Sequence, residues 1–362
     1  TYRTSSHIVG ATRPRTIEVR SHVLAGNETV ATRTFNAVRA VEPLGAVSAV
    51  LGLADGRRAV GGAFTGFSRT PRMGVLRYVS ATDTLDATAA FGGGFNGSVF
   101  SAVALPDGSY IFGGSFTRYR DQVATNVARV LPNGQLDLTF NPPSGANGAN
   151  GAVNAIATDG TSIWLAGAFT TYRGGVANRV AKISLSGVLD TTFSPSSGGN
   201  GVNATVNALA LDGGVLYIGG TFATYRGATA TRIAKVNAAT GVLDTVFNPA
   251  SGGNGVNNTV FALLADASGV WIGGQFTTYR GAAANRLARV SLTGVLDTVI
   301  SPSTGGNGFN NIVRAFALSG TSLYVGGDFT TYRGGAANRI ALLSAATGSI
   351  DTIFNPTSGG NG

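Results

Sequence analysis

The chain has 362 residues, of which 43% are hydrophobic and 12% charged, and it contains 54 glycines and no cysteine. The absence of cysteine excludes disulfide bridges and thiolate metal sites, and no apolar run approaches the ~18 residues that a membrane-spanning helix needs. The net charge of +9 comes mainly from arginine and is concentrated in residues 1–72. This charge favours acidic partners such as polysaccharide or lipid headgroups, although it is equally consistent with a charge that keeps a glycine-rich surface soluble.

Residues 1–45 form the least regular part of the sequence, yet they contain echoes of a repeat that is clearer further on. Thr1-Tyr2-Arg3 matches a Thr-Tyr-Arg phrase that recurs later, residues 15–19 resemble 179–183, and residues 34–36 resemble 139–141. We interpret this basic segment as the second half of a degenerate repeat. The only two histidines, His7 and His22, lie here and are too few for a zinc site.

From about Ala46 one phrase recurs, namely two small residues, a variable residue and then phenylalanine. Its clearest copies are Gly219-Gly220-Thr221-Phe222 and Gly273-Gly274-Gln275-Phe276. The phenylalanines of the six copies are 52 to 54 residues apart and are Phe64, Phe116, Phe169, Phe222, Phe276 and Phe329. A fixed period of this size indicates one supersecondary unit that is stacked several times.

The unit is clearest in residues 204–257, where four short apolar runs are separated by turn residues. The runs are Thr205–Leu211, Val215–Phe222, Arg232–Val236 and Leu243–Phe247. The Gly219-Gly220 pair inside the second run indicates a bulge or a close approach of another backbone. No stretch has helical periodicity, so each unit is predicted to consist of four short β-strands.

Four antiparallel strands repeated in this way predict an all-β fold, a β-propeller with six to seven blades. A parallel β-helix has shorter coils, and a row of sandwich domains needs longer units. We expect residues 1–45 to be a degenerate half-blade and residues 46–362 to be a propeller of six repeats. Because the sequence begins part-way through a unit, we expect the ring to close by shared strands, with the two ends completing one blade. Residues 357–362, however, match the loop that leads to a further first strand, so a chain that continues past Gly362, a partner strand or a neighbouring copy are the alternatives.

Three phrases of the unit resemble the delta-60 repeat, a bacterial propeller-like repeat of unknown function. They are the Gly-Gly-x-Phe-Thr phrase, the strand 338–343 and the strand Leu243–Pro249, and the resemblance covers about residues 46–362. The first unit departs from the pattern, because it has Gly66-Phe67-Ser68 in place of Thr-Tyr-Arg. The resemblance implies a secreted or cell-surface bacterial protein with no established catalytic role.

One aspartate recurs in every unit, just before the fourth predicted strand, and the column consists of Asp86, Asp137, Asp190, Asp244, Asp297 and Asp351. One carboxylate per blade does not provide the six to eight oxygens that calcium prefers. We therefore expect these aspartates to accept backbone N–H groups at the turn, or to pair with Arg179, Arg232, Arg286 and Arg339. A second column, Trp164, Tyr217, Trp271 and Tyr324, is predicted to form core between blades.

Tyrosine and arginine are adjacent in every unit from the second onward. The pairs are Tyr119-Arg120, Tyr172-Arg173, Tyr225-Arg226, Tyr279-Arg280 and Tyr332-Arg333. A ring of such pairs on one face of a propeller would suit stacking on sugars or binding of acidic groups by planar guanidinium groups. Alternatively, tyrosine packs on the neighbouring blade and arginine bonds to backbone carbonyls, which the recurrence of the pair in every unit favours.

These patterns favour a non-enzymatic, extracellular or cell-surface protein with a structural or adhesive role, as a module of a larger chain or surface assembly. The alternative is a propeller that binds carbohydrate or polyanions through the Tyr-Arg pairs and residues 1–72. No catalytic constellation stands out, so neither an enzyme, a cofactor nor a metal is expected. The expected partners are acidic polysaccharide or another surface component, or a strand-completing chain; a membrane span and a nucleic-acid partner are not expected.

Overall fold

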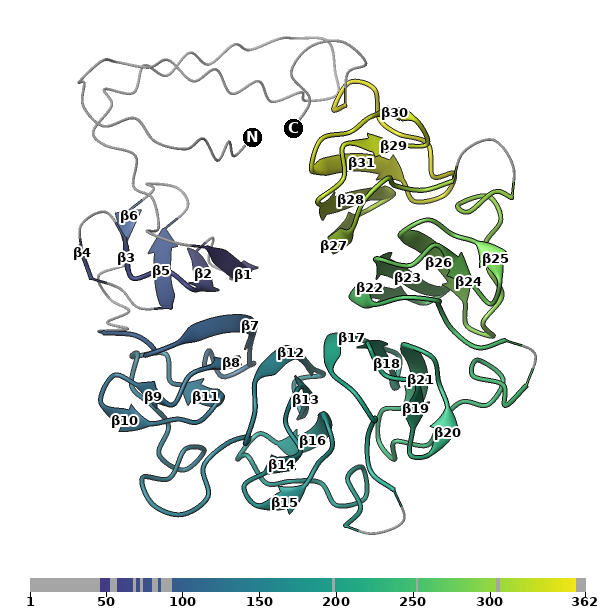
Figure 1. Ribbon diagram of the computed structural model, residues 1–362. Coiled ribbons are helices and arrows are strands. Elements are labelled where there is room, and N and C mark those ends of the chain that lie inside the picture. Colours follow the sequence, from purple (N-terminus) through teal and green to yellow (C-terminus); the bar gives the residue numbers. More distant parts are fainter. Residues whose placement is uncertain are drawn as a thin grey trace, which may run out of the picture.

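The computed structural model describes residues 46–52, 57–67, 70–71, 74–79, 84–85, 93–196, 199–251, 253–303 and 307–355. This part of the chain contains strands and turns only, arranged as six blades around one axis (Figure 1). The predicted β-propeller is confirmed. The predicted half-blade in residues 1–45, Asp86 and the loop 357–362 lie outside the described residues.

Each blade is an antiparallel meander, and a hairpin of two-residue strands lies between its second and third strands. Blade 1 consists of β1 (Val47–Gly52), β2 (Arg57–Gly62), β5 (Val75–Val79) and β6 (Thr84–Leu85), with the hairpin β3 (Gly66–Phe67) and β4 (Thr70–Pro71). Blade 2 consists of β7 (Ser98–Ala104), β8 (Tyr110–Ser115) and β11 (Val127–Val130), with the hairpin β9 (Arg118–Tyr119) and β10 (Gln122–Val123). Blade 3 consists of β12 (Val153–Thr158), β13 (Ser162–Gly167) and β16 (Val180–Ser184), with the hairpin β14 (Thr171–Tyr172) and β15 (Gly175–Val176).

The last three blades repeat the same order. Blade 4 consists of β17 (Val206–Asp212), β18 (Val215–Gly220) and β21 (Ile233–Asn237), with the hairpin β19 (Thr224–Tyr225) and β20 (Ala228–Thr229). Blade 5 consists of β22 (Val260–Asp266), β23 (Gly269–Gly274) and β26 (Leu287–Ser291), with the hairpin β24 (Thr278–Tyr279) and β25 (Ala282–Ala283). Blade 6 consists of β27 (Val313–Ser319), β28 (Ser322–Gly327) and β31 (Ile340–Ser344), with the hairpin β29 (Thr331–Tyr332) and β30 (Gly335–Ala336).

The first strand of each blade is the innermost, and it contacts the first strand of the next blade in chain order (Figure 1). The two glycines near the end of the second strand permit close packing, Gly219 against Val260 of the next blade and Gly220 against the first strand of its own blade. Opposite Gly220 the register of β17 shifts after Val206, which is a β-bulge. A Cβ atom on Gly220 would lie 2.1 Å from the carbonyl oxygen of Thr205, so only glycine fits there. The predicted bulge and close backbone approach are both confirmed.

The fourth predicted strand is wrong in extent for blades 2 to 6. In blade 4 the run Leu243–Phe247 contributes a single bridge, between Leu243 and Val236, and then forms a turn. The reason is Asp244: its carboxylate accepts the N–H groups of Val246 and Phe247, and its carbonyl accepts the N–H of Asn248. An aspartate that satisfies backbone donors locally competes with strand pairing.

The apolar core consists of clusters that two consecutive blades share. One cluster joins Trp164 and Phe193 of blade 3 to Val206, Leu216 and Ile218 of blade 4. Trp164, Tyr217 and Trp271 are at most 2% exposed, so the prediction that their column forms core between blades is confirmed for blades 3 to 5. Within the described residues there is no helix with the length and apolar character that crossing a bilayer requires.

Candidate functional site: the Tyr-Arg pairs

The Tyr-Arg pairs lie in the small hairpins, one pair in each of blades 2 to 6. Tyrosine ends the first hairpin strand, as Tyr172 does in β14 and Tyr225 in β19, and arginine begins the turn. In Figure 1 the hairpin strands β10, β15, β20 and β25 lie on the outer side of their blades. The pairs are therefore distributed around the ring, one in the small hairpin of each of these blades.

Each tyrosine of these pairs is buried and bonds within its own blade. Its hydroxyl donates to the carbonyl of a glycine in the turn after the third strand, with oxygen–oxygen distances of 2.7 to 3.1 Å; the bonds are Tyr119–Gly134, Tyr172–Gly187, Tyr225–Gly241, Tyr279–Gly294 and Tyr332–Gly348. All five rings are at most 2% exposed. Burial raises the pKa of Tyr225, Tyr279 and Tyr332 to about 12 and also raises the pKa of Tyr119 and Tyr172. The hydroxyls thus stay protonated and fix the hairpin to the blade.

Each arginine of the pairs in blades 3 to 6 bonds instead to the preceding blade. Its Nη2 atom donates to a backbone carbonyl in the fourth segment of that blade, 33 residues earlier in the chain. The bonds are Arg173 to Phe140, Arg226 to Phe193 and Arg280 to Phe247, the last two at 2.5 Å, and Arg333 to Ile300 at 3.0 Å. The backbone of all four is left-handed with φ of 47°, a conformation that disfavours side chains with a Cβ. Arginine nevertheless occupies this position in each of blades 2 to 6.

The guanidinium group also lies over the ring of its own tyrosine, at 5.2 to 5.7 Å from the ring centre in all five pairs, including Arg120. The pair is thus a connector: tyrosine bonds to its own blade and arginine bonds to the one before. This is the structural alternative that recurrence favoured. Ligand binding by the pairs stays a prediction, and a ligand would meet the arginine rather than the buried tyrosine ring.

The aspartate column has the predicted role at the turn, but its basic partner differs from the prediction. Asp137, Asp190 and Asp244 pair with Arg129, Lys182 and Lys235 of the third strand at 3.4, 3.1 and 2.8 Å. Arg179, Arg232 and Arg286 donate instead to carbonyls of the next inter-blade loop, those of Val202, Val256 and Phe309. Lys182 lies within the third strand β16 and reaches the carboxylate, whereas Arg179 precedes this strand and has a left-handed backbone.

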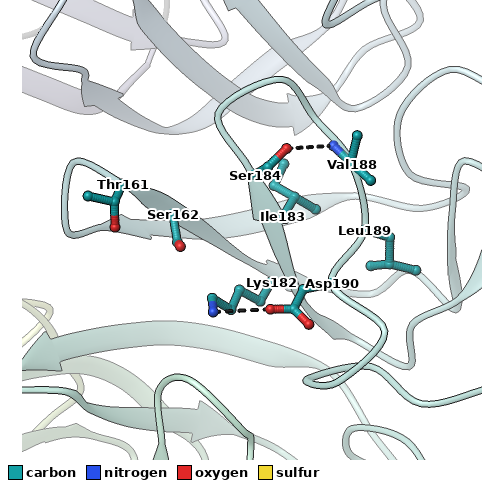
Figure 2. A pocket seen from close by; sticks show the side chains of 8 residues that line it. All are labelled: Thr161, Ser162, Lys182, Ile183, Ser184, Val188, Leu189 and Asp190. Atoms are coloured by element: carbon teal, nitrogen blue, oxygen red, sulfur yellow. Dashed lines mark hydrogen bonds and ion pairs between the residues drawn. The ribbon is translucent and has the colours of Figure 1, made fainter.

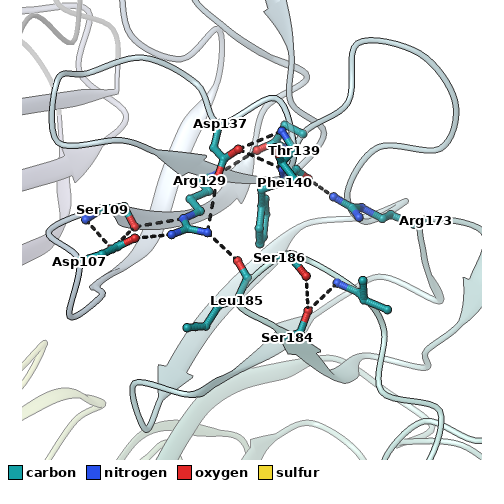
Figure 3. A network of polar contacts seen from close by, with 12 residues as sticks. Asp107, Ser109, Arg129, Asp137, Thr139, Phe140, Arg173, Ser184, Leu185 and Ser186 are labelled. Carbon is teal, nitrogen blue, oxygen red and sulfur yellow. Dashed lines mark hydrogen bonds and ion pairs between the residues drawn. The ribbon is translucent and has the colours of Figure 1, made fainter.

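Figure 3 shows how one such ion pair extends across a blade junction. Arg129 contacts Asp107 and Asp137 of its own blade and donates to the carbonyl of Leu185 in blade 3 at 2.8 Å. In blade 4 Lys235 donates in the same way to Leu292 of blade 5 at 2.7 Å. Burial raises the pKa of the Asp244 carboxyl, but hydrogen bonds from Lys235 and from the N–H groups of Phe247 and Val246 outweigh burial and lower it.

In blade 3 the basic residue of the third strand, Lys182, lines a hollow (Figure 2). Lys182 bonds to Asp190 at 3.1 Å and lies over the Trp164 ring, while the carbonyl of Ala238 accepts the indole N–H of Trp164 at 3.0 Å. The lining residues are Thr161, Ser162, Lys182, Ile183, Ser184, Val188, Leu189 and Asp190. The two charged residues among them, Lys182 and Asp190, pair with each other. No cluster of three or more metal-ligating side chains occurs in the described ranges.

Sequence reasoning missed the role of the loop asparagines. The side chain of Asn150 accepts the N–H groups of Thr170 and Thr171, and its amide donates to the Thr170 hydroxyl. The same arrangement recurs at Asn257 and Asn310. Asparagine is suited to such turns because its short amide mimics a backbone group. The 53-residue recurrence of asparagine was the available signal.

The residue at the bulge of the innermost strand differs between blades, which sequence reasoning did not single out. The residues there are Ser48, Phe100, Asn154, Asn207, Phe261 and Arg314. Asn154 and Asn207 each donate to a backbone carbonyl of the next blade at 2.9 Å. Arg314 lies over the Phe261 ring and forms an ion pair with Asp328 at 2.5 Å. If a ligand selects one sector of the ring, this variable column has the asymmetry to do so.

A protein-family model matches five of the six repeats. Residues 105–140, 162–193, 214–247, 270–298 and 322–354 match a family model described as a domain of unknown function (DUF5122) beta-propeller. The repeats fit this β-propeller family. Each DUF5122 match runs from the second strand, or the turn before it, to the fourth segment, and leaves out the variable innermost strand. No curated protein matches the sequence.

Solved structures with a similar fold are distant in sequence. The computationally designed Ika8 protein has a TM-score of 0.52 and 15% identity, over 86% of this chain and 74% of that one. The WD40 beta propeller domain of Doa1 has a TM-score of 0.51 and 12% identity, over 86% and 82%. The extracellular domain of the candidate one-component system BT4673 from B. thetaiotaomicron has a TM-score of 0.50 and 17% identity, over 88% of this chain and 35% of that one. At these identities the likeness concerns the β-propeller fold alone.

Proposed function

We propose that this propeller is a non-enzymatic module with a structural or adhesive role at the bacterial cell surface, and that its repeats are of the delta-60 kind. The observation that carries the proposal is that the recurring polar side chains bond within or between blades. Tyrosine, arginine, aspartate and asparagine columns all serve to hold hairpins, turns and neighbouring blades together. A repeat whose motifs serve its own assembly suits a rigid module better than a shaped active site.

The carboxyl groups support the absence of catalysis. A general acid at neutral pH needs a raised pKa, whereas the resolved shifts among the described aspartates are downward. For Asp190, burial raises the pKa, but hydrogen bonds from Lys182 and from the N–H groups of Phe193 and Thr192 outweigh it. Asp266 behaves likewise, through Ser268 and Arg289. Such carboxylates remain ionised and paired.

The test is a binding experiment with beads coated with the 1–362 protein, on films of neutral and acidic polysaccharide and on bacterial envelopes. We expect attachment that persists as salt is raised. Attachment that disappears with salt would favour the polyanion-binding alternative, and turnover of polysaccharide or ester substrates by the pure protein would overturn the proposal.

Matched variants separate the two modes of binding. Arg173→Gln and Arg280→Gln change Tyr-Arg pairs, whereas Arg314→Gln removes the same charge at the innermost strand. If the pairs are connectors only, Arg173→Gln and Arg280→Gln are less stable than the wild type. Their binding then depends on salt concentration in the same way as the binding of Arg314→Gln. Selective loss of binding to the acidic polysaccharide films in Arg173→Gln and Arg280→Gln would instead assign the ligand to the pairs.

A further inference from the structure

In blade 2 an arginine of the third strand crosses to the turn between the first and second strands. Arg129 donates through Nε to the Ser109 hydroxyl at 3.1 Å, and the other end of its guanidinium group pairs with Asp107. In blade 5 Arg289 likewise pairs with Asp266 at 3.0 Å. In these two blades the guanidinium group therefore fills the space between the third strand and this turn.

Blade 3 has Lys182 at the same position, and its shorter side chain does not cross. The ammonium group pairs with Asp190 of the fourth segment at 3.1 Å, and the side chain is 16% exposed. Asp159, the aspartate of the turn, accepts the N–H groups of Thr161 and Ser162 instead. An ammonium group has three N–H donors, and Asp190 is the one polar partner of Lys182 Nζ among the described residues. Two donors therefore remain for a ligand.

The next blade does not supply a second partner either. In blades 2 and 4 the basic residue of the third strand also donates to a carbonyl of the following blade, at 2.8 and 2.7 Å. The equivalent carbonyl beside blade 3 is that of Ala238, and it accepts the indole N–H of Trp164 at 3.0 Å. The hollow on blade 3 thus results from two local differences, a lysine in place of arginine and a tryptophan that takes the carbonyl.

The walls of this hollow are polar on one side and apolar on the other. Figure 2 shows Ser162 at one side and Val188 and Leu189 at the other, with Lys182 and Asp190 between them. The Ser162 hydroxyl has no hydrogen-bond partner among the described residues, and Val188 is 61% exposed. The volume is about 270 Å³, just below the ~300–1,000 Å³ of pockets that hold drug-sized ligands. The space therefore suits one small ring.

We propose that this hollow binds one neutral sugar ring. A sugar hydroxyl both donates and accepts hydrogen bonds, so a pair of them can accept from Lys182 Nζ and donate to the Asp190 carboxylate or the Ser162 hydroxyl. The C–H groups of the ring would lie on Val188 and Leu189. A charged ligand is disfavoured, because Asp190 repels an anion and Lys182 repels a cation.

The ligand is either a free sugar or a unit of a polysaccharide chain, since both present the same hydroxyl groups. The site deepens the adhesive role and rests on the proposed function only for its purpose in the cell. A soluble sugar can bind in the hollow whether or not the protein attaches to envelopes, so the two proposals are tested separately.

Residues from other blades provide variants that the fold already accepts. Lys182→Arg introduces the residue of blades 2 and 5, which would cross to Asp159 and fill the hollow. Ser162→Val introduces the residue that blade 4 has at the equivalent position, Val215, and removes the free hydroxyl. Lys235→Arg makes the same exchange in blade 4 and is the matched control. Thermal unfolding of each variant checks that the fold is retained.

Binding is measured by saturation-transfer difference NMR on the 1–362 protein with glucose, galactose and mannose, each as the free sugar and as the methyl glycoside. We expect a signal from at least one sugar with the wild type and with Lys235→Arg. Loss of one hydrogen bond weakens affinity about fivefold, so we expect at least this reduction in Lys182→Arg and Ser162→Val. A signal from the methyl glycosides identifies a chain unit as the ligand, and a signal from the free sugars alone identifies a free sugar.

The proposal is overturned if none of the neutral sugars gives a signal, or if Lys182→Arg binds as well as the wild type. It is also overturned if galacturonate or glucosamine binds in the hollow and the neutral sugars do not, because the ligand would then be an ion. Sugar binding without attachment to envelopes would refute the adhesive role and keep this site. Attachment without any sugar signal would refute this site alone.

Discussion

Removal of one hydroxyl from each of two tyrosines in blade 4 should have different effects on stability. Tyr217 and Tyr225 are both 1% exposed. The Tyr225 hydroxyl donates to the carbonyl of Gly241 at 2.7 Å. The Tyr217 hydroxyl is just as deeply buried but has no hydrogen-bond partner among the described residues. The two tyrosines therefore differ in hydrogen bonding while burial and chemistry stay constant.

The expected magnitudes follow from the two environments. Tyr225→Phe removes a hydrogen bond with a net value of about 0.5–1.5 kcal/mol and leaves a buried carbonyl unpaired, so we expect a loss of about 1–2 kcal/mol in the free energy of unfolding. Burial of a hydroxyl without a partner costs about 1–3 kcal/mol in mutational data. Tyr217→Phe relieves that cost, and we expect a result between no change and a gain of about 1 kcal/mol.

Urea unfolding provides the measurement. Trp164 belongs to the core cluster that blades 3 and 4 share and Trp271 to the cluster that blades 5 and 6 share, so tryptophan fluorescence reports on both parts of the ring. Because stacked repeats do not always unfold in one step, hydrogen exchange of the amides in β17, β18 and β21 should accompany it. Equal losses in the two variants, or a larger loss in Tyr217→Phe, would refute the reasoning.

Four further predictions concern single contacts. The pKa values of about 12 at Tyr225, Tyr279 and Tyr332 mean that neutral tyrosine stabilises the fold fully below about pH 10 and that this stability is lost as pH rises through 12; tyrosinate absorbance and unfolding should therefore rise together. The lowered pKa of Asp244 contributes stability above about pH 4 that is lost as pH falls through the folded-state value, so Asp244→Asn should show a smaller acid-induced fall in melting temperature than the wild type. Arg232→Asn should change the free energy of unfolding by less than about 0.5 kcal/mol. The reason is that Asn126, at the equivalent position of blade 2, has the same left-handed backbone and donates to the equivalent carbonyl, that of Ala149, at 2.9 Å. Arg232→Ala should lose about 1–2 kcal/mol, and parallel urea titrations measure both variants. Asp328→Asn breaks the partly exposed pair with Arg314 and should cost no more than about 1 kcal/mol; a larger loss in thermal unfolding would contradict this assignment.

Sequence periodicity was sufficient for the elements whose residues interact locally. The turn at residues 212–214, the bulge opposite Gly219-Gly220 and the three longer strands of each blade follow from neighbouring residues. The fourth strand did not, because its apolar pattern at 243–247 is typical of a strand while Asp244 binds the backbone into a turn. The pattern of side chains indicated burial correctly but not the path of the backbone.

The sequence by itself determined the all-β repeat, its period and the residues that form the core between blades, since these depend on alternation and recurrence. Only the tertiary structure decided what the polar columns do. Arg226 bonds to a carbonyl 33 residues earlier, and Lys235 bonds to one 57 residues later. Both acceptors are backbone atoms, which every residue carries, so no side-chain pattern marks them. Their position depends on how one blade is turned against the next, and that rotation is fixed by packing across the whole interface.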